Sequence, residues 1–321
     1  MRGGQVVPGA ARDEGRPSWA PPSLDSGRLQ AALKSLELTV RGRLDGLLQG
    51  NHLGLVPGPG TEPGEARIYQ PGDDVRRMDW AVTARMNEPH IRQTVADREL
   101  ETWVALDLSP SLDFGSAACD KRELAVAGLA AVTHLTSGGG NRIGAVVDNG
   151  ERLTRMPARG GSAYARALLK KVVEMPRAEE GTRGDLARLV ESLRRPPRRR
   201  GLAVVISDFL GPLEWQRALR GLGTRHSLLA IEVLDPRDVE LPDVGTVLLS
   251  DPETGKQREV RTTPVLRKEF AAAAAAHREE VAAALRRAGC AHLVLRTDSD
   301  WIADVVRFVM ARKRGWSGGA A

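Results

Sequence analysis

Cysteine is scarce in this 321-residue sequence, which contains only Cys119 and Cys290. Two cysteines so far apart form no metal-ligand spacing, and such sparse use is typical of a reducing compartment. Long hydrophobic runs are also missing, because residues 124–135 are too few to span a membrane and include Ala, Gly and Thr. The N-terminal residues contain no apolar core of the kind that a signal peptide needs. These absences predict a cytoplasmic protein without a membrane span.

Aromatic residues make up only 4% of the sequence, although its formal net charge is +6. The densest basic stretch, residues 194–200, contains no aromatic residue on which a nucleic-acid base could stack. We interpret this stretch as a solvated connector, and an acidic protein surface would suit it as well as phosphate would. The composition therefore argues against nucleic acid as a partner.

Common catalytic motifs are absent as well. The sequence contains no P-loop, no H-E-x-x-H and no G-x-S-x-G. The Gly-rich residues 138–144 precede a predicted strand, whereas the glycines of a dinucleotide-binding fingerprint follow one. The six histidines are scattered, and no spacing ties one of them to a serine.

The most informative stretch that is present spans residues 102–111. Its first half is short, apolar and partly β-branched, which predicts a buried strand. The apolar run stops at Asp107, and two hydroxyls follow at alternate positions, Ser109 and Ser111. Ligands of open α/β sheets bind at the carboxyl ends of strands, so these three side chains are candidates for a common site.

The D-x-S-x-S pattern at 107–111 offers only oxygen donors, which suit a hard cation such as Mg²⁺, with Mn²⁺ or Ca²⁺ as further candidates. Two of the three donors are neutral hydroxyls, so the ion would retain an affinity for another anionic ligand. Water, a substrate or a carboxylate of a partner could supply that ligand. The alternative interpretation is a strand end whose Asp and Ser cap a turn or the next helix.

A second predicted strand, residues 202–207, also ends in a carboxylate, Asp208. Ahead of it, Gly181-Thr182 precedes a predicted helix. Together with D-x-S-x-S, this order resembles the metal-ion-dependent adhesion site of von Willebrand factor A domains. The resemblance implies Asp107, Ser109, Ser111, Thr182 and Asp208 as metal ligands, with carboxylates that bind directly or through water. Two questions stay open: Ser162 is the rival of Thr182 as the third-loop ligand, and Asp113 either joins the site or caps a helix.

The region before these strands has a different character. Residues 1–25 contain Gly, Pro and scattered charge without periodicity, so we expect them to be disordered. Apolar residues then recur at intervals of three and four over 29–47, which predicts an amphipathic helix. A Gly/Pro-rich loop follows at 52–65.

Residues 69–85 combine a Pro-Gly turn with closely spaced opposite charges. Such charges most simply form an ion-pair network that fixes an irregular segment. The alternatives are a docking surface or a contribution to the metal site. The residues concerned are Asp73, Asp74, Arg76, Arg77, Asp79 and Trp80.

Three stretches together, YQPGDDVRRMDWAVTAR at 69–85, RELETWVALDLSPSLDFGS at 98–116 and VVISDFLGP at 204–212, resemble domain-of-unknown-function family 58. That resemblance covers nearly the whole chain after residue 28. It implies a von Willebrand A-like domain with a Mg²⁺-type site. It also implies a chaperone-associated or regulatory role beside a MoxR-type AAA+ ATPase.

Strand-like and helix-like segments alternate over the rest of the chain, which predicts a doubly wound α/β domain with a mostly parallel sheet. The expected organisation is a disordered segment at 1–25, a family-specific helix, loop and β segment at 26–101, the α/β domain at 102–312 and a flexible tail at 313–321.

Two functions compete. The first is a non-enzymatic adaptor whose metal ion receives an Asp or Glu carboxylate of a protein partner. The second is a metal-dependent hydrolase, which would require a general base and a substrate pocket. The sequence places no histidine or extra carboxylate beside the motif apart from Asp113, which favours the adaptor.

Overall fold

The computed structural model describes residues 17–24, 29–48, 66–69, 78, 80–86, 88–92, 100–136, 140–179, 181–194, 201–250 and 257–317. Residues 1–16 of the predicted disordered segment lie outside these ranges, as do 318–321 of the predicted tail.

A six-stranded sheet forms the centre of the molecule, in the order β10-β7-β6-β3-β4-β5. All neighbouring strands in it are parallel except β5, which runs antiparallel to β4 at one edge. This arrangement confirms the predicted α/β class with a mostly parallel sheet. The strands are β3 (Glu101–Asp107), β4 (Arg142–Asp148), β5 (Leu153–Gly160), β6 (Gly201–Ser207), β7 (His226–Leu234) and β10 (Cys290–Arg296).

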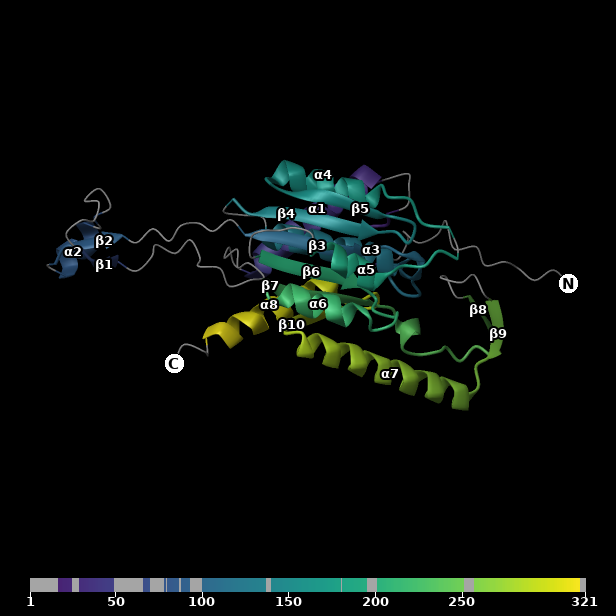
Figure 1. Cartoon of the computed structure of the whole chain (residues 1–321). Coiled ribbons are helices and arrows are strands. Elements are labelled where there is room, and N and C mark those ends of the chain that lie inside the picture. The colour runs from purple at the N-terminus through teal and green to yellow at the C-terminus, as the bar shows by residue number, and fades with distance from the viewer. Residues whose placement is uncertain are drawn as a thin grey trace.

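Helices cover both faces of the sheet, as Figure 1 shows. One face packs against α1 (Leu29–Leu48), α3 (Lys121–Thr136), α4 (Ser162–Val173) and α8 (Trp301–Ser317). The other packs against α5 (Leu186–Ser192), α6 (Trp215–Gly223) and α7 (Pro264–Arg287).

The central strands are apolar along their whole length because both of their faces are covered. Alternate residues of β3 point to opposite faces: Val104 and Leu106 lie in the core under α1 and α3, and Trp103 and Ala105 lie in the core under α5 and α6. The carboxylate of β3 comes at the end of this apolar strand, at Asp107.

The N-terminal side of the domain differs from the sequence-based expectation. Residues 17–24 were predicted to be disordered, but Trp19 and Leu24 pack against the core, and the Leu24 N–H donates to Glu123 Oε1 at 3.1 Å. These contacts help to hold the short segment in place, although its sequence shows no periodic pattern. The predicted amphipathic helix is confirmed as α1, whose buried residues include Leu36 and Val40.

A short hairpin pairs β1 (Ala66–Ile68) with β2 (His90–Arg92), and α2 (Trp80–Met86) lies between them in the sequence. The second half of the stretch at 69–85, predicted to be irregular, is therefore helical. Of the six candidate docking residues, the structure describes Trp80, which is exposed; Asp73, Asp74, Arg76, Arg77 and Asp79 lie outside the described residues.

At the C-terminal side, β8 (Thr246–Ser250) pairs antiparallel with β9 (Gln257–Arg261), beside the start of α7 (Figure 1). Helix α8 extends to Ser317, so residues 313–317 of the predicted flexible tail are helical. Within the described part of the chain, no helix combines the length and the apolar character needed to cross a membrane.

Candidate metal-binding site

The site begins at Asp107, the last residue of β3. Strand β6 is the parallel neighbour of β3, so Asp208, the residue after β6, lies at the same edge of the sheet. The Asp107 carboxylate is buried and held at both oxygens: Oδ1 accepts the Ser109 N–H at 3.0 Å, and Oδ2 accepts the Ser207 hydroxyl at 2.7 Å. The two strand-end carboxylates thus lie on adjacent strands, as their positions in the sequence indicate.

The two serines of the motif face each other across a single 3-10 turn, Pro110–Leu112. Their Oγ atoms are 3.3 Å apart, and Ser109 is fully buried while Ser111 is half-buried. The loop before α5 closes over Ser109 because Gly184 lies against it. A Cβ atom on Gly184 would lie 2.6 Å from Ser109 Cβ and 3.6 Å from Asp107 Oδ1.

The two candidates for the third loop, Thr182 and Ser162, lie at opposite ends of strand β4. A Cβ atom on Gly150 would lie 3.1 Å from Thr182 Cγ2 and 3.2 Å from Pro110 Cδ, so the Thr182 loop and the motif loop share this neighbour. The Thr182 hydroxyl donates its proton to the Glu179 carbonyl at 2.7 Å, so this bond does not use the lone pairs of the hydroxyl oxygen, with which a metal ligand binds. Ser162 instead follows Gly160, which pairs with the first residue of β4, at the edge away from Asp107.

Burial, followed by the negative charge of Asp208, raises the pKa of Asp107 to about 6. Hydrogen bonds from Ser109 and Ser207 oppose this rise. A carboxylate with such a pKa is poorly compensated in its ionised form, and a cation beside it would favour that form.

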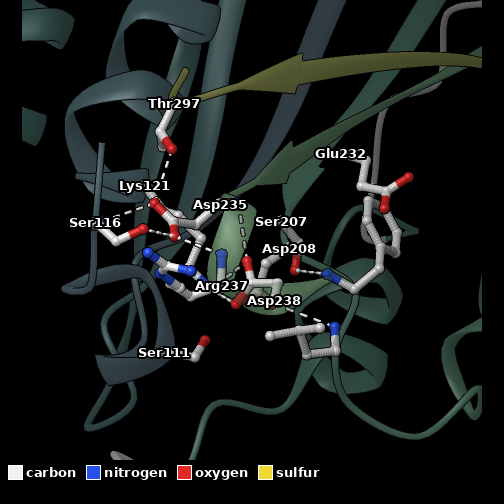
Figure 2. Close-up of polar contacts among 12 residues, drawn as sticks. Ser111, Ser116, Lys121, Ser207, Asp208, Glu232, Asp235, Arg237, Asp238 and Thr297 are labelled. Carbon is white, nitrogen blue, oxygen red and sulfur yellow. Dashed lines mark hydrogen bonds and ion pairs between the residues drawn. The ribbon is translucent and has the colours of Figure 1, made fainter. Parts of the chain in front are cut away.

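Two residues that the sequence did not single out, Lys121 and Asp238, complete the electrostatics of the site. Lys121 is the first residue of α3, and its Nζ lies 2.9 Å from Asp208 Oδ2 and 3.2 Å from Asp238 Oδ2 (Figure 2). Its side chain is only 1% exposed. Burial lowers the pKa of Lys121, but the charges of Asp208 and Asp238 outweigh burial and raise it, so the ammonium stays charged.

Asp238 is held by the loop after β7. Asp235 and Asp238 form a capping box at the turn Pro236–Asp238, in which the Asp235 N–H donates to Asp238 Oδ2 at 2.9 Å. Asp235 is fully buried and also accepts the Thr297 hydroxyl at 2.7 Å and the Ser116 N–H at 2.8 Å (Figure 2). This network fixes the position of Asp238 against Lys121.

The backbone turns sharply just after Asp208. Phe209 has φ 53°, and it is the one non-glycine residue with a positive φ within the described ranges. The ring of Phe209 packs edge-on against Trp215 at 5.3 Å, while Asp208 Oδ1 accepts the Leu210 N–H at 3.3 Å. Packing thus stabilises a backbone conformation that is uncommon for a bulky residue and aims the Asp208 carboxylate at Lys121.

Asp113 does not stand free beside the motif. Its Oδ1 lies 3.3 Å from Arg122 Nη1 and 3.6 Å from Arg177 Nη1. Burial raises the pKa of Asp113, and the two arginines counteract that effect. Asp113 therefore belongs to a neighbouring ion-pair cluster, at the C-terminal end of the 3-10 turn.

The donor set fits a hard divalent cation better than a soft one. Over the described residues, no group of three or more His, Cys, Asp or Glu side chains forms a metal-binding cluster. The site offers instead the carboxylate of Asp107 and the adjacent hydroxyls of Ser109 and Ser111, all oxygen donors. Asp208 adds a second carboxylate, one oxygen of which is bonded to Lys121.

Comparison with known proteins gives one family and several close relatives. The family model described as "Protein of unknown function DUF58" matches residues 65–280. The uncharacterized protein Rv1480 of Mycobacterium tuberculosis is 61% identical over 299 residues, which cover 93% of this chain and 94% of that protein. The uncharacterized protein Mb1516 of Mycobacterium bovis matches equally well, with 61% identity over 299 residues.

Solved structures give more distant matches. The protein BatB of Bacteroides thetaiotaomicron shares 15% identity, with coverage of 67% of this chain and 99% of BatB and a TM-score of 0.39. A von Willebrand factor type A protein of Catenulispora acidiphila shares 18% identity, with coverage of 58% of this chain and 44% of that protein and a TM-score of 0.29.

Proposed function

The chain belongs to the DUF58 family of proteins of unknown function, and on this premise we propose that it is a metal-dependent protein-binding adaptor. Asp107, Ser109, Ser111, Thr182 and Asp208 would hold a Mg²⁺ ion, for which Mn²⁺ or Ca²⁺ could substitute. When bound, that ion would supply positive charge for an Asp or Glu carboxylate of a protein partner. The protein would work in the cytoplasm with a MoxR-type AAA+ ATPase, in a chaperone-like or complex-assembly role.

The observation that carries the proposal is the buried Asp107 carboxylate beside two facing serine hydroxyls. Asp107 is 6% exposed, its pKa is raised to about 6, and the two Oγ atoms of Ser109 and Ser111 lie 3.3 Å apart next to it. An ionised carboxylate is costly to bury without a compensating charge. The arrangement is best explained if the compensating charge is a cation that both hydroxyls also contact.

The carboxylates around the motif support binding more than hydrolysis. Asp208 is paired with Lys121, and Asp113 with Arg122 and Arg177. Ion pairing leaves these carboxylates engaged, whereas a general base must reach a substrate or a water molecule and accept its proton. A metal-dependent hydrolase is accordingly the alternative outcome of the experiment below.

For the ATPase, we propose docking through the charged stretch at 69–85. The described residue of that stretch with the largest apolar surface is Trp80, whose side chain is 68% exposed at the start of α2. Exposed tryptophans are frequent energetic centres of protein interfaces. This docking surface would be separate from the metal site, so the ATPase and a carboxylate-bearing client could bind together.

A pull-down with the purified MoxR-type ATPase from the same organism tests the adaptor. Wild-type protein, Trp80→Ala, Asp107→Ala and the surface control Asp243→Ala are compared in roughly millimolar Mg²⁺ and in EDTA. We expect Trp80→Ala to capture less of the ATPase than wild type does. We expect wild type and Asp243→Ala to retain client proteins in Mg²⁺, and we expect these clients to be lost from Asp107→Ala and from wild type in EDTA. Client capture by wild type that is the same in EDTA as in Mg²⁺, or capture by Asp107→Ala that equals that of wild type in Mg²⁺, would overturn the adaptor. Mg²⁺-dependent hydrolysis of a phosphate or ester substrate, lost in Asp107→Ala, would favour the enzyme.

A further inference from the structure

Lys121 is a buried ammonium placed directly against the candidate metal site. Its Nζ donates to Asp208 Oδ2 at 2.9 Å and to Asp238 Oδ1 at 3.3 Å, and its side chain is 1% exposed. A buried lysine contributes stability only when its partners repay its desolvation. A hydrophobic residue of similar size would fill the same space, so a reason beyond packing is expected for the charge.

The other cations close to this part of the molecule are engaged elsewhere. Arg122 contacts Asp113, and Arg177 contacts both Asp113 and Asp120. Among the described residues, Lys121 is the cation that contacts Asp208.

Counting formal charges shows what Lys121 does. Asp107, Asp208 and Asp238 are three carboxylates, and Lys121 compensates one of them. Loss of Lys121 would make the site one unit more negative, with or without a divalent ion. The loaded site would then bind an acidic ligand less well, because Coulomb forces are weakly screened at buried positions.

We propose that Lys121 is a resident counter-charge that sets the selectivity of the site: it weakens the binding of the divalent ion and makes the loaded site accept an acidic ligand. This inference rests on the proposed function and deepens it. Lys121 acts through Asp208 and touches neither the incoming ligand nor the hydroxyls of the motif, so it is a positioning residue. Asp238, the second partner of Lys121, adds a negative charge and therefore has the opposite effect on the affinities for the divalent ion and the acidic ligand.

Three variants separate this role from a packing role. Lys121→Met removes the positive charge, Asp238→Asn removes one negative charge, and the double variant removes both and restores the wild-type balance. Each single change beside Asp208 is expected to shift an affinity by about tenfold or more. Lys170→Met is the matched control, because Lys170 is half-exposed on α4 and pairs with Glu174.

Two titrations are made at pH 7.5 by calorimetry. The first adds MgCl₂ alone, and the second adds an acetylated Ala-Glu repeat peptide at saturating Mg²⁺, with the Ala-Gln peptide as its neutral counterpart. For Mg²⁺ we expect Lys121→Met to bind tightest, wild type and the double variant to be similar, and Asp238→Asn to bind weakest. For the acidic peptide we expect the reverse order, and Lys170→Met should match wild type in both titrations.

The reversal of the two orders is the decisive result, since a loss of packing would weaken both affinities together. Thermal melts confirm that each variant is folded. If Lys121→Met does not fold, Asp238→Asn alone still tests the inference, because it must bind Mg²⁺ more weakly and the acidic peptide more tightly than wild type. Changes of both affinities in the same direction, or no change in Asp238→Asn, would overturn it. Failure of the wild type to bind Mg²⁺ would instead overturn the proposed function.

Discussion

Replacing Gly184 by alanine tests how closely the loop before α5 is fitted to the motif. The new Cβ would lie 2.6 Å from Ser109 Cβ and 2.8 Å from Ser109 Oγ. Rotation of the Ser109 side chain cannot relieve the first contact, because Cβ is fixed by the backbone. Either the loop or the motif must therefore move, and overpacking of this kind costs about 1–3 kcal/mol.

We expect Gly184→Ala to lower the free energy of unfolding by about 2 kcal/mol, measured by urea unfolding followed by circular dichroism. Because Ser109 is displaced, we also expect the Mg²⁺ affinity to fall by about tenfold, which corresponds to about 1.4 kcal/mol. Gly211→Ala is the matched control, since no atom lies within 4 Å of the position of its Cβ. If Gly184→Ala keeps both the stability and the Mg²⁺ affinity of wild type, the loop is not part of the site.

The remaining predictions concern charge, packing and docking. The pKa of Asp107 is raised to about 6 in the folded state from an ordinary value of 3.8, so the folded state binds the proton more tightly. In EDTA, the ionised Asp107 carboxylate therefore destabilises the folded protein above pH 6, and this destabilisation disappears as the pH falls toward 4. Urea unfolding should show that Asp107→Asn is more stable than wild type at pH 7 and about as stable at pH 4. Gly201→Ala should cost about 3 kcal/mol or prevent folding, because its Cβ would lie 1.9 Å from the Glu101 carbonyl oxygen; a thermal melt like that of wild type would contradict this packing. Trp80→Ala should change the stability by less than about 0.5 kcal/mol but weaken ATPase binding by about tenfold in a calorimetric titration, and unchanged binding would remove α2 from the docking surface.

Much of the site could be predicted because strand ends are visible in the sequence. Asp107 and Asp208 each follow a short apolar run, and parallel neighbours must bring such residues to one edge of the sheet. The alternate positions of Ser109 and Ser111 in one turn likewise made their proximity predictable.

Other features could not be predicted because they depend on distant contacts. Lys121 looks like a solvated residue at a helix start, and its partners Asp208 and Asp238 are 87 and 117 residues away in the chain. The fit of Gly184 against Ser109 depends on how two loops pack, which no local pattern encodes. The packing of Trp19 on the core also depends on distant contacts, and the short segment around Trp19 has no periodicity that would predict it.

A calorimetric titration of MgCl₂ into the wild-type protein, Asp107→Ala and Asp243→Ala at pH 7.5 tests directly whether Asp107 holds a divalent ion. Asp107 lies at the centre of the proposed ligand set, whereas Asp243 is an exposed carboxylate paired with Arg267. We expect saturable binding at one site in wild type and Asp243→Ala, and a loss of at least about a hundredfold in affinity, or about 2.7 kcal/mol, in Asp107→Ala. Absence of Mg²⁺ binding in wild type, or equal binding in Asp107→Ala, would contradict the proposed metal site.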